Sequence, residues 1–350
     1  MKKLNQLFAL ALSISLVGCT LDSSLALAKN NQVPAQTNQQ LATQWMQYLA
    51  SDTLMGRKTG SPQMEEVQAW LVSTYQDIGI QKLPNAKSYL QTFLAETGDG
   101  QLAAANVLGY LPCNCDSDKF IIIGAHYDHI GHDPSLENDQ IFNGADDDAS
   151  GVVTSLIIAK QLAKQKKLPV NVIIAAWDAE EIGLQGSKYY VKNPLVPLEQ
   201  LETGFMFELV GTMTEPNKAW MTGSHYSSLF SLLKDELGKR NWQLGDDPFI
   251  EQGLFMRSDN APFALMDINR EKMVKVFREK QKVDITGLPV HAISVWNGQD
   301  HYHKVNDDIS VINIPNMTSL AEAIADVILH FPEDISIEWQ TNAQFNFSKP

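Results

Sequence analysis

The hydrophobic and polar positions of this chain alternate between two patterns, which predict strands and helices in turn. Continuous apolar runs at 119–125 and 170–177 are typical of strands buried on both faces of a sheet. Apolar residues recur at helical spacing in the segments that follow, at 149–164 and about 184–191. The expected strands are 88–95, 104–111, 119–125, 170–177, 204–210, 219–222 and 290–296, and the expected helices are 39–49, 62–78, 149–164, 184–191, 226–237 and 314–329.

This alternation predicts an α/β fold. We expect a three-layer αβα sandwich with a mixed, largely parallel central sheet, because buried parallel strands need helices on both faces. A single domain of this kind accommodates the chain from 39 to 340. In such sheets ligands bind outside the carboxyl ends of the strands. Polar residues that follow the strands are therefore the first candidates for a functional site.

Imidazole and carboxylate side chains gather after the first buried strand. His126 and Asp128 end the run 119–125, and the aspartates Asp146, Asp147 and Asp148 precede the next helix. Two residues apart in extended chain, His126 and Asp128 point to one face, so Asp128 can accept the second ring N–H of His126. Nitrogen and oxygen donors of this kind favour a hydrolytic metal site. A polar loop with an acidic turn is the alternative for this stretch alone.

Further candidates follow the later strands. Glu180 and Glu181 are adjacent and cannot point the same way, which suits a division between proton transfer and metal binding. Glu208 lies at the end of a third strand, and the segment 301–303 offers distant imidazoles. Acidic clusters on a surface are usually only solvated. The order of these groups after successive strands nevertheless favours one shared site.

Composition limits the class of partner. With 44% hydrophobic and 19% charged residues, the chain has the make-up of an ordinary globular protein and is not disordered throughout. A net charge of −14 argues against nucleic acid as a partner, because phosphate binding needs a basic surface. An acidic surface favours solubility and says little about the substrate.

The first residues have the pattern of an export signal. Two lysines precede an apolar run at 7–17 that is too short to span a bilayer. The run ends in Leu16-Val17-Gly18-Cys19, which resembles the lipobox of bacterial lipoproteins. That resemblance implies a signal peptide at 1–19, cleavage before Cys19, and a lipid anchor on the Cys19 sulfur that holds the exported protein to the cell envelope.

A plain secretory signal cut after Ala26 or Ala28 is the alternative, and it also implies export. Residues 20–38 are rich in Ser, Asn, Gln and Ala, so we expect a flexible tether there.

Two other segments receive no assigned chemistry. Cys113 and Cys115 either close a small ring in an oxidising compartment or remain free thiols in a turn. Segment 269–283, with six basic and two acidic residues, interrupts the alternation of expected strands and helices. It is a candidate lid over the site or a docking surface, and a solvated insertion is the alternative.

Six segments, taken in order, resemble a known family. They are GAHYDHIG at 124–131, NGADDDASG at 143–151, AAWDAEEIGLQGS at 175–187, FMFELVG at 205–211, RSDNAPFA at 257–264 and HYHKVNDD at 301–308. They resemble the two-zinc exopeptidase family of secreted bacterial leucyl aminopeptidases, glutamate carboxypeptidase and glutaminyl cyclases. The resemblance spans about 40–330 and implies a phosphorylase/hydrolase-like fold.

The resemblance also implies ligands for two Zn²⁺ ions. His126 and Glu208 would bind the first ion, Glu181 and His303 the second, and Asp147 would bridge both. Asp146 and Asp148 are then expected to shape the turn. His301 is the one competitor of His303 for the ligand role, and His303 is preferred because it follows the tyrosine as in the family pattern.

Three catalytic roles are implied in the same way. Asp128 would orient His126, Glu180 would be the general base that takes a proton from the attacking water, and Tyr302 would steady the oxyanion. For His129 and His132 we expect polar loop roles, although both lie close to His126 in the sequence.

The chain departs from the family pattern in two places. The position of Glu208 is often aspartate, and glutamate keeps the oxygen ligand but adds a methylene. Segment 269–283 lies between RSDNAPFA and GLPVHAISVW, which family members place close together, so it is positioned to reshape the substrate entrance.

We therefore predict an exported, zinc-dependent metallo-exopeptidase that acts on peptides, first of all an aminopeptidase. Carboxypeptidase or dipeptidase activity is the next alternative, with Arg57 or Arg257 as a partner for a substrate carboxylate, and then a glutaminyl cyclase with one zinc. An iron oxygenase built on His126 and Asp128 is disfavoured, because such enzymes are typically β-barrels. A non-catalytic surface lipoprotein is the last alternative.

Overall fold

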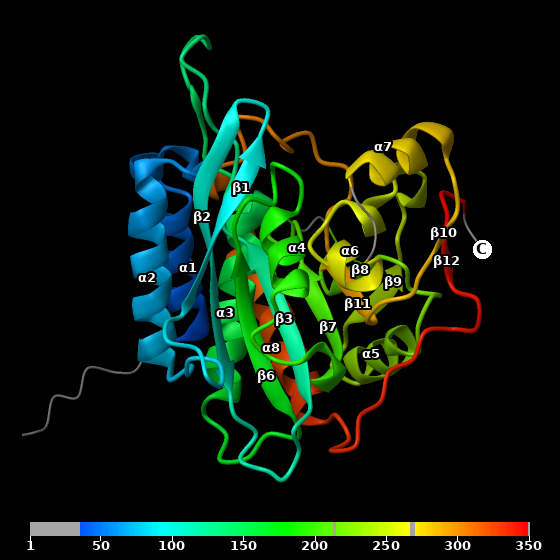
Figure 1. The fold of residues 1–350 in the computed structure, drawn as a ribbon. Coiled ribbons are helices and arrows are strands. Elements are labelled where there is room, and N and C mark those ends of the chain that lie inside the picture. The colour runs from blue at the N-terminus through cyan, green and yellow to red at the C-terminus, as the bar shows by residue number, and fades with distance from the viewer. Residues whose placement is uncertain (1–35, 213–214, 267–269, 349–350) are drawn as a thin grey trace, which may run out of the picture. The chain divides into compact units, whose positions relative to one another are not determined.

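An eight-stranded mixed sheet runs through the protein, in the order β1-β2-β6-β3-β7-β11-β8-β9 (Figure 1). The computed structural model describes residues 36–212, 215–266 and 270–348. The expected signal at 1–19 and nearly all of the expected tether at 20–38 lie outside these residues. From Thr37 onward the chain forms one compact unit.

The centre of the sheet is parallel and its flanks are mixed. The central pairs are parallel and join β6, β3, β7 and β11 in that order. At one edge β2 pairs antiparallel with β6, and β1 with β2. On the other side β8 pairs antiparallel with β11. β9 then pairs in parallel with β8. The strands are β1 (Leu90–Thr97), β2 (Gly100–Leu111), β3 (Phe120–His126), β6 (Asn171–Trp177), β7 (Leu201–Phe207), β8 (Lys218–Met221), β9 (Gln243–Asp246) and β11 (Val290–Ser294).

Helices cover both faces of the sheet and bury two apolar cores. Side chains alternate along β3, so Ile121 and Ile123 enter one core while Phe120 and Ile122 enter the other. The first core is covered by α1 (Asn38–Leu49), α2 (Pro62–Ile78), α3 (Ser150–Leu162), α5 (Leu229–Gly238) and α8 (Ile314–Leu329), and the second by α4 (Gln185–Lys192) and α6 (Ala261–Ala264). The predicted three-layer α/β sandwich is thereby confirmed.

A third, smaller core lies beside this sandwich, under the basic segment. α7 (Arg270–Glu279) packs there with the C-terminal segment, whose β12 (Gln344–Phe345) pairs with β10 (Val283–Asp284). The chain thus adds paired structure beyond residue 340. Of the alternatives for Cys113 and Cys115, the structure contains the disulfide.

Shorter elements connect the strands. They are β4 (Gly131–His132), β5 (Ile141–Phe142), a π-helical turn η2 (Ala145–Ala149), and the 3₁₀ turns η1 (Asp52–Arg57), η3 (Leu198–Gln200), η4 (Ile250–Gln252), η5 (Leu254–Met256) and η6 (Ile309–Val311). Within the described ranges no helix has the length and apolar character needed to cross a bilayer.

Candidate metal and catalytic site

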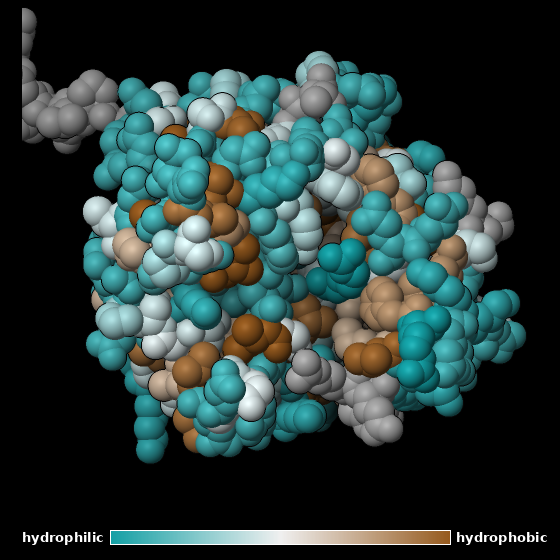
Figure 2. All heavy atoms as spheres, turned by 90° about the horizontal axis from the view of Figure 1, so that it is seen from above, coloured by the Kyte–Doolittle hydropathy of each residue, from teal (hydrophilic) through white to brown (hydrophobic). Residues whose placement is uncertain are grey.

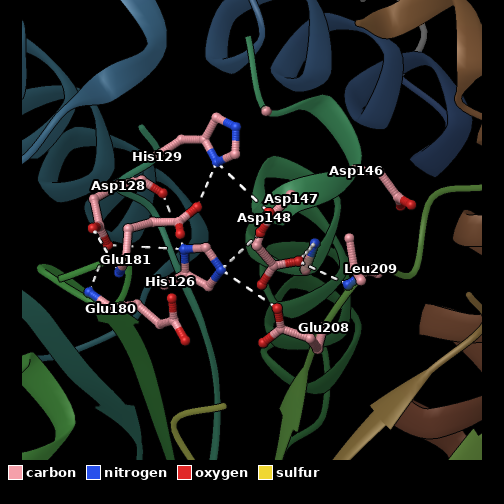
Figure 3. Close-up of polar contacts among 12 residues, drawn as sticks. His126, Asp128, His129, Asp146, Asp147, Asp148, Glu180, Glu181, Glu208 and Leu209 are labelled. Carbon is pink, nitrogen blue, oxygen red and sulfur yellow. Dashed lines mark hydrogen bonds and ion pairs between the residues drawn. The ribbon is translucent and has the colours of Figure 1, made fainter. Parts of the chain in front are cut away.

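Three neighbouring parallel strands deliver the candidate residues to one edge of the sheet. β6, β3 and β7 lie side by side and end at Trp177, His126 and Phe207. His126 ends β3, the loops that leave these strands carry the candidate carboxylates, and His301 and His303 come from the loop after β11. Figure 3 shows His126, Glu181, Asp147 and Glu208 turned toward one another. Glu208 lies just after β7, because this strand ends earlier than the sequence pattern predicts.

The first donor cluster consists of His126, Asp147 and Glu208. The Nε2 atom of His126 lies 3.1 Å from Asp147 Oδ1 and 3.6 Å from Glu208 Oε1. His126 and Asp147 are buried, and the side chain of Glu208 is mostly buried. The longer glutamate at 208 therefore still brings an oxygen to the histidine.

The second cluster shares Asp147 and adds Glu181, His303 and His129. The Nε2 atom of His303 lies 3.1 Å from Asp147 Oδ2 and 3.1 Å from Glu181 Oε2. The two oxygens of Asp147 thus face different imidazoles, His126 on one side and His303 on the other. This is the arrangement of a carboxylate that bridges two cations.

The donor atoms themselves fit the binding of metal ions. Three buried atoms at the centre lack a hydrogen-bond partner: His126 Nε2, His303 Nε2 and Asp147 Oδ2. Buried polar atoms are normally hydrogen bonded, so three unpaired nitrogen and oxygen atoms at one place need an explanation. Imidazole nitrogen and carboxylate oxygen are suitable ligands for zinc and related divalent ions. The residues present therefore fit a site for two cations.

The charges of the cluster follow from the same contacts. Burial would raise the pKa of Asp147, but the close imidazoles of His126 and His303 hold that pKa well below its usual range. Burial would lower the pKa of His303, yet its contacts with Asp147 and Glu181 raise that pKa to about 10. Because a metal ligand must be a neutral imidazole, metal binding here is coupled to proton release.

Asp307 holds the backbone of the turn that contains Asp146 and Asp147. Its two carboxylate oxygens accept hydrogen bonds from the backbone N–H groups of Asp146 and Asp147, at 2.8 and 3.1 Å. Asp148 turns away from the cluster and accepts from the N–H groups of Gly151 and Leu209. These contacts orient the carboxylate of Asp147 between the histidines.

Asp146 and His301 pair with each other outside the cluster. His301 Nε2 lies 2.9 Å from Asp146 Oδ2, and Asp146 also accepts hydrogen bonds from Gly211 and Thr212. Figure 3 shows Asp146 pointing away from the other acidic residues. The structure thus brings His303, and not His301, to the donor atoms.

Asp128 contacts His126 in a different way from the one expected. His126 Nδ1 lies 3.0 Å from the backbone carbonyl of Asp128 and 3.8 Å from its carboxylate. The carboxylate instead accepts from the N–H groups of Glu180 and Glu181 and from the Thr59 hydroxyl. β3 ends at His126, so the alternation of an extended strand does not continue to Asp128. Asp128 therefore positions the two glutamates as well as the histidine.

Glu180 and Glu181 point to different parts of the site, as their adjacency predicts. Glu181 lies within the second cluster, whereas Glu180 lies near His126 and Glu181 and outside the two clusters that share Asp147 (Figure 3). Burial raises the pKa of Glu180 well above its usual range, against the attraction of His126. A carboxylate so disposed is suited to accept a proton.

His129 is the site residue that the sequence analysis missed. Its Nδ1 atom lies 2.7 Å from Glu181 Oε1 and 3.8 Å from Asp147 Oδ2. The strand pattern gave no reason to place it there, since it follows His126 by an odd number of residues. The chain leaves the strand before His129, and a backbone hydrogen bond from His129 to Arg57 fixes the new direction. The signal in the sequence is only its proximity to His126.

Arg57, a candidate for binding a substrate carboxylate, has another role. It is fully buried, and its guanidinium donates to the backbone carbonyls of Leu49, Tyr127, Asn143 and Gly144. Four carbonyl acceptors account for most of its donors. Arg57 therefore ties the loop after β3 to the aspartate turn and does not face substrate.

An apolar pocket opens beside Glu208. Trp220 and Trp296 line it together with Leu254, and Tyr302 and Arg257 also line it. The rings of Trp296 and Tyr302 are 6.5 Å apart, and an Arg257 nitrogen donates to the Tyr302 hydroxyl at 3.4 Å. Mostly apolar pockets with a few polar groups are typical of ligand sites.

Comparison with known proteins places this fold and site in a family. The model of peptidase family M28 matches residues 106–328. A probable leucine aminopeptidase 2 from Aspergillus oryzae is 26% identical over 235 residues, which are 63% of this chain and 43% of that protein. The chain thus aligns with less than half the length of this relative.

Solved structures show the same fold. A Zn-dependent exopeptidase from Parabacteroides distasonis is similar with a TM-score of 0.61 and 19% identity, over 83% of this chain and 98% of that chain. A glutaminyl cyclase from Porphyromonas gingivalis has a TM-score of 0.61 and 21% identity, over 83% and 97%. Because the family model covers more than half of the sequence, this chain belongs to peptidase family M28, which confirms the family expected from the six motifs.

We predict that Asp147→Asn loses at least one metal ion, because an amide offers a single oxygen and cannot bridge two cations. Metal content after zinc loading and gel filtration, measured by mass spectrometry, should fall from two ions per chain to one or none. Asp146→Asn and Asp148→Asn are the matched controls, since their side chains bond to backbone and to His301. Equal loss of metal from all three variants would refute this ranking.

Proposed function

We propose that this protein is a zinc-dependent aminopeptidase that uses two metal ions. The observation that carries the proposal is the sharing of Asp147 between two donor clusters, with Glu180 next to them and lining the larger cavity. Relatives support the choice: one is named a probable leucine aminopeptidase and a structural neighbour a Zn-dependent exopeptidase. The first ion would be held by His126, Asp147 and Glu208, and the second by Asp147, Glu181 and His303.

The ions, when bound, lower the pKa of water and stabilise charge on the carbonyl oxygen. The chain supplies the remaining steps. Glu180 accepts a proton from the attacking water, and the same carboxyl group donates it to the nitrogen of the leaving peptide. The Tyr302 hydroxyl is placed between the pocket and the cluster, where it can donate a hydrogen bond to the oxygen on which negative charge develops.

Two cavities that meet at Arg257 and Tyr302 support cleavage at the end of a peptide chain. The apolar pocket beside Glu208 is the smaller of the two, and a larger, groove-shaped cavity extends from Glu180 and Glu181. Arg257 and Tyr302 line both. The smaller pocket suits a single terminal side chain, and the groove suits the chain that continues beyond the cleaved bond.

The charges support cleavage from the N-terminus. Arg57 is buried and bonded to four backbone carbonyls. Arg257 is the one basic residue among the described residues that line the small pocket. Arg257 already donates a hydrogen bond to the Tyr302 hydroxyl, so the described lining of the pocket offers no unpaired basic group to a substrate carboxylate.

A panel of substrates tests this proposal. We expect release of the amine from leucyl anilides, abolished by a chelator and restored by zinc, and no cleavage of N-blocked dipeptides. Cleavage of the blocked dipeptides alone would make the protein a carboxypeptidase. Cyclisation of N-terminal glutamine without hydrolysis would make it a glutaminyl cyclase.

The variant Glu180→Gln tests the proton-transfer role. It should retain two metal ions and lose activity by about 10²- to 10⁴-fold, the usual contribution of a positioned general base. Metal content and steady-state rates on leucyl anilide are to be measured together. Loss of a metal ion from this variant would place Glu180 among the ligands.

We further propose that the enzyme is exported and anchored to the cell envelope through a lipid on Cys19, which the lipobox-like sequence supports. Cells fed an alkyne-tagged fatty acid should label the wild-type protein and not Cys19→Ala, and only the wild type should remain with membranes after a salt wash. Labelling of both proteins would contradict an anchor at Cys19.

A further inference from the structure

The basic segment that the sequence singled out is fixed to the body of the protein. Val276 of α7 is buried in the third core, and the ring of Phe277 lies 5.5 Å from that of Phe347. Lys280 lies 4.0 Å from the same Phe347 ring and donates a hydrogen bond to the carbonyl of Glu251. A solvated insertion would make no such contacts. α7 therefore presents a defined face to its surroundings.

That face forms one wall of the groove that begins at the catalytic cluster. Met273, Val274 and Phe277 line the groove at α7, and Glu181 and His303 line it at the strand ends. Seen from the end of the molecule where α7 lies, the surface is hollowed near its centre, with hydrophobic residues beside the hollow (Figure 2). The groove is thus continuous with the proposed site of cleavage.

Exposed apolar side chains concentrate in this groove. Among the described residues five large hydrophobic side chains are exposed, and three of them line it: Ile182 at 36%, Met266 at 41% and Val274 at 57%. Leu94 and Leu136, the other two, do not line the groove. Single exposed apolar residues are ordinary on a protein surface, whereas a contiguous set beside a catalytic site marks a binding surface.

We propose that α7, with Ile182 and Met266, forms the binding surface for the second and third residues of the peptide substrate, and that it selects apolar side chains there. This inference rests on the proposed aminopeptidase activity. The small pocket beside Glu208 holds the first side chain, and Tyr302 and Arg257, which line both cavities, mark the boundary between them. The rest of the substrate then lies along Val274 and Met273.

Three substrates that share an N-terminal leucine test the proposal. Leucinamide has no downstream side chain, Leu-Phe-Phe-amide places two apolar side chains in the groove, and Leu-Ser-Ser-amide places two small polar ones there. We expect kcat/KM for Leu-Phe-Phe-amide to exceed that for Leu-Ser-Ser-amide by about tenfold, mainly through KM, the lower end of the discrimination that hydrophobic pockets achieve.

The double variant Met266→Gln/Val274→Gln should reduce this preference to about twofold or less, while kcat/KM for leucinamide stays within about twofold of wild type. Both side chains are exposed, so the variant is expected to fold, and circular dichroism confirms it. The matched control is Leu94→Gln/Leu136→Gln, which removes two exposed apolar side chains outside the groove and should keep the full preference.

A wild-type enzyme without the preference, or an equal loss in both double variants, would overturn this inference while leaving the aminopeptidase intact. An equal fall on leucinamide and on the peptides in the groove variant would do the same, since it would show damage to the catalytic centre. Absence of hydrolysis of all three substrates by the zinc-loaded wild type would overturn the aminopeptidase proposal, and this inference with it.

Discussion

The site depends on a buried carboxylate held between two imidazoles. Asp147 is inaccessible to solvent, and a charge in that position is tolerated only when opposite charges and hydrogen bonds surround it. His126 and His303 approach different oxygens of this group, and the backbone N–H of Asp147 is held by Asp307. The two donor clusters that would hold the proposed ions both contain this one side chain.

The strands and loops around Asp147 hold this geometry in place. Parallel strands β6, β3 and β7 bring three loops to one edge, but strands alone do not set the direction of the loops. Arg57 fixes the loop after β3 to the aspartate turn through four backbone carbonyls. Asp128 then holds the backbone of Glu180 and Glu181. Buried polar groups of this kind are costly to leave unpaired, so each of these networks also stabilises one conformation of its loop.

Much of this was predictable from the sequence, because the buried strands are long and apolar. The seven expected strands are present in the eight-stranded sheet, and the order of motifs places Asp147, Glu181 and His303 at one edge. The eighth strand, β9, was not predicted, since Gln243–Asp246 is a short edge strand with one buried apolar residue. Its pairing with β8 comes from the tertiary structure and not from a hydrophobic pattern.

The remaining differences concern loops, where periodicity gives no direction. His129 reaches Glu181, and the carboxylate of Asp128 accepts from the glutamate backbone, in the loop that begins where β3 ends at His126. The function of Arg57 depends on carbonyls far away in the sequence, and the face that α7 presents depends on packing against the C-terminal segment. Such contacts have no local signature in the residues that make them.

The claim that Asp147 bridges two cations is tested most directly by anomalous X-ray scattering from crystals of the zinc-loaded protein, recorded above and below the zinc absorption edge. If Asp147 bridges two cations, two zinc peaks lie on opposite sides of its carboxylate, one bound by His126 and Glu208 and one by Glu181 and His303, each about 2.0–2.2 Å from its ligand atoms. A single peak, or a pair of peaks of which one has no contact with Asp147, would contradict this claim.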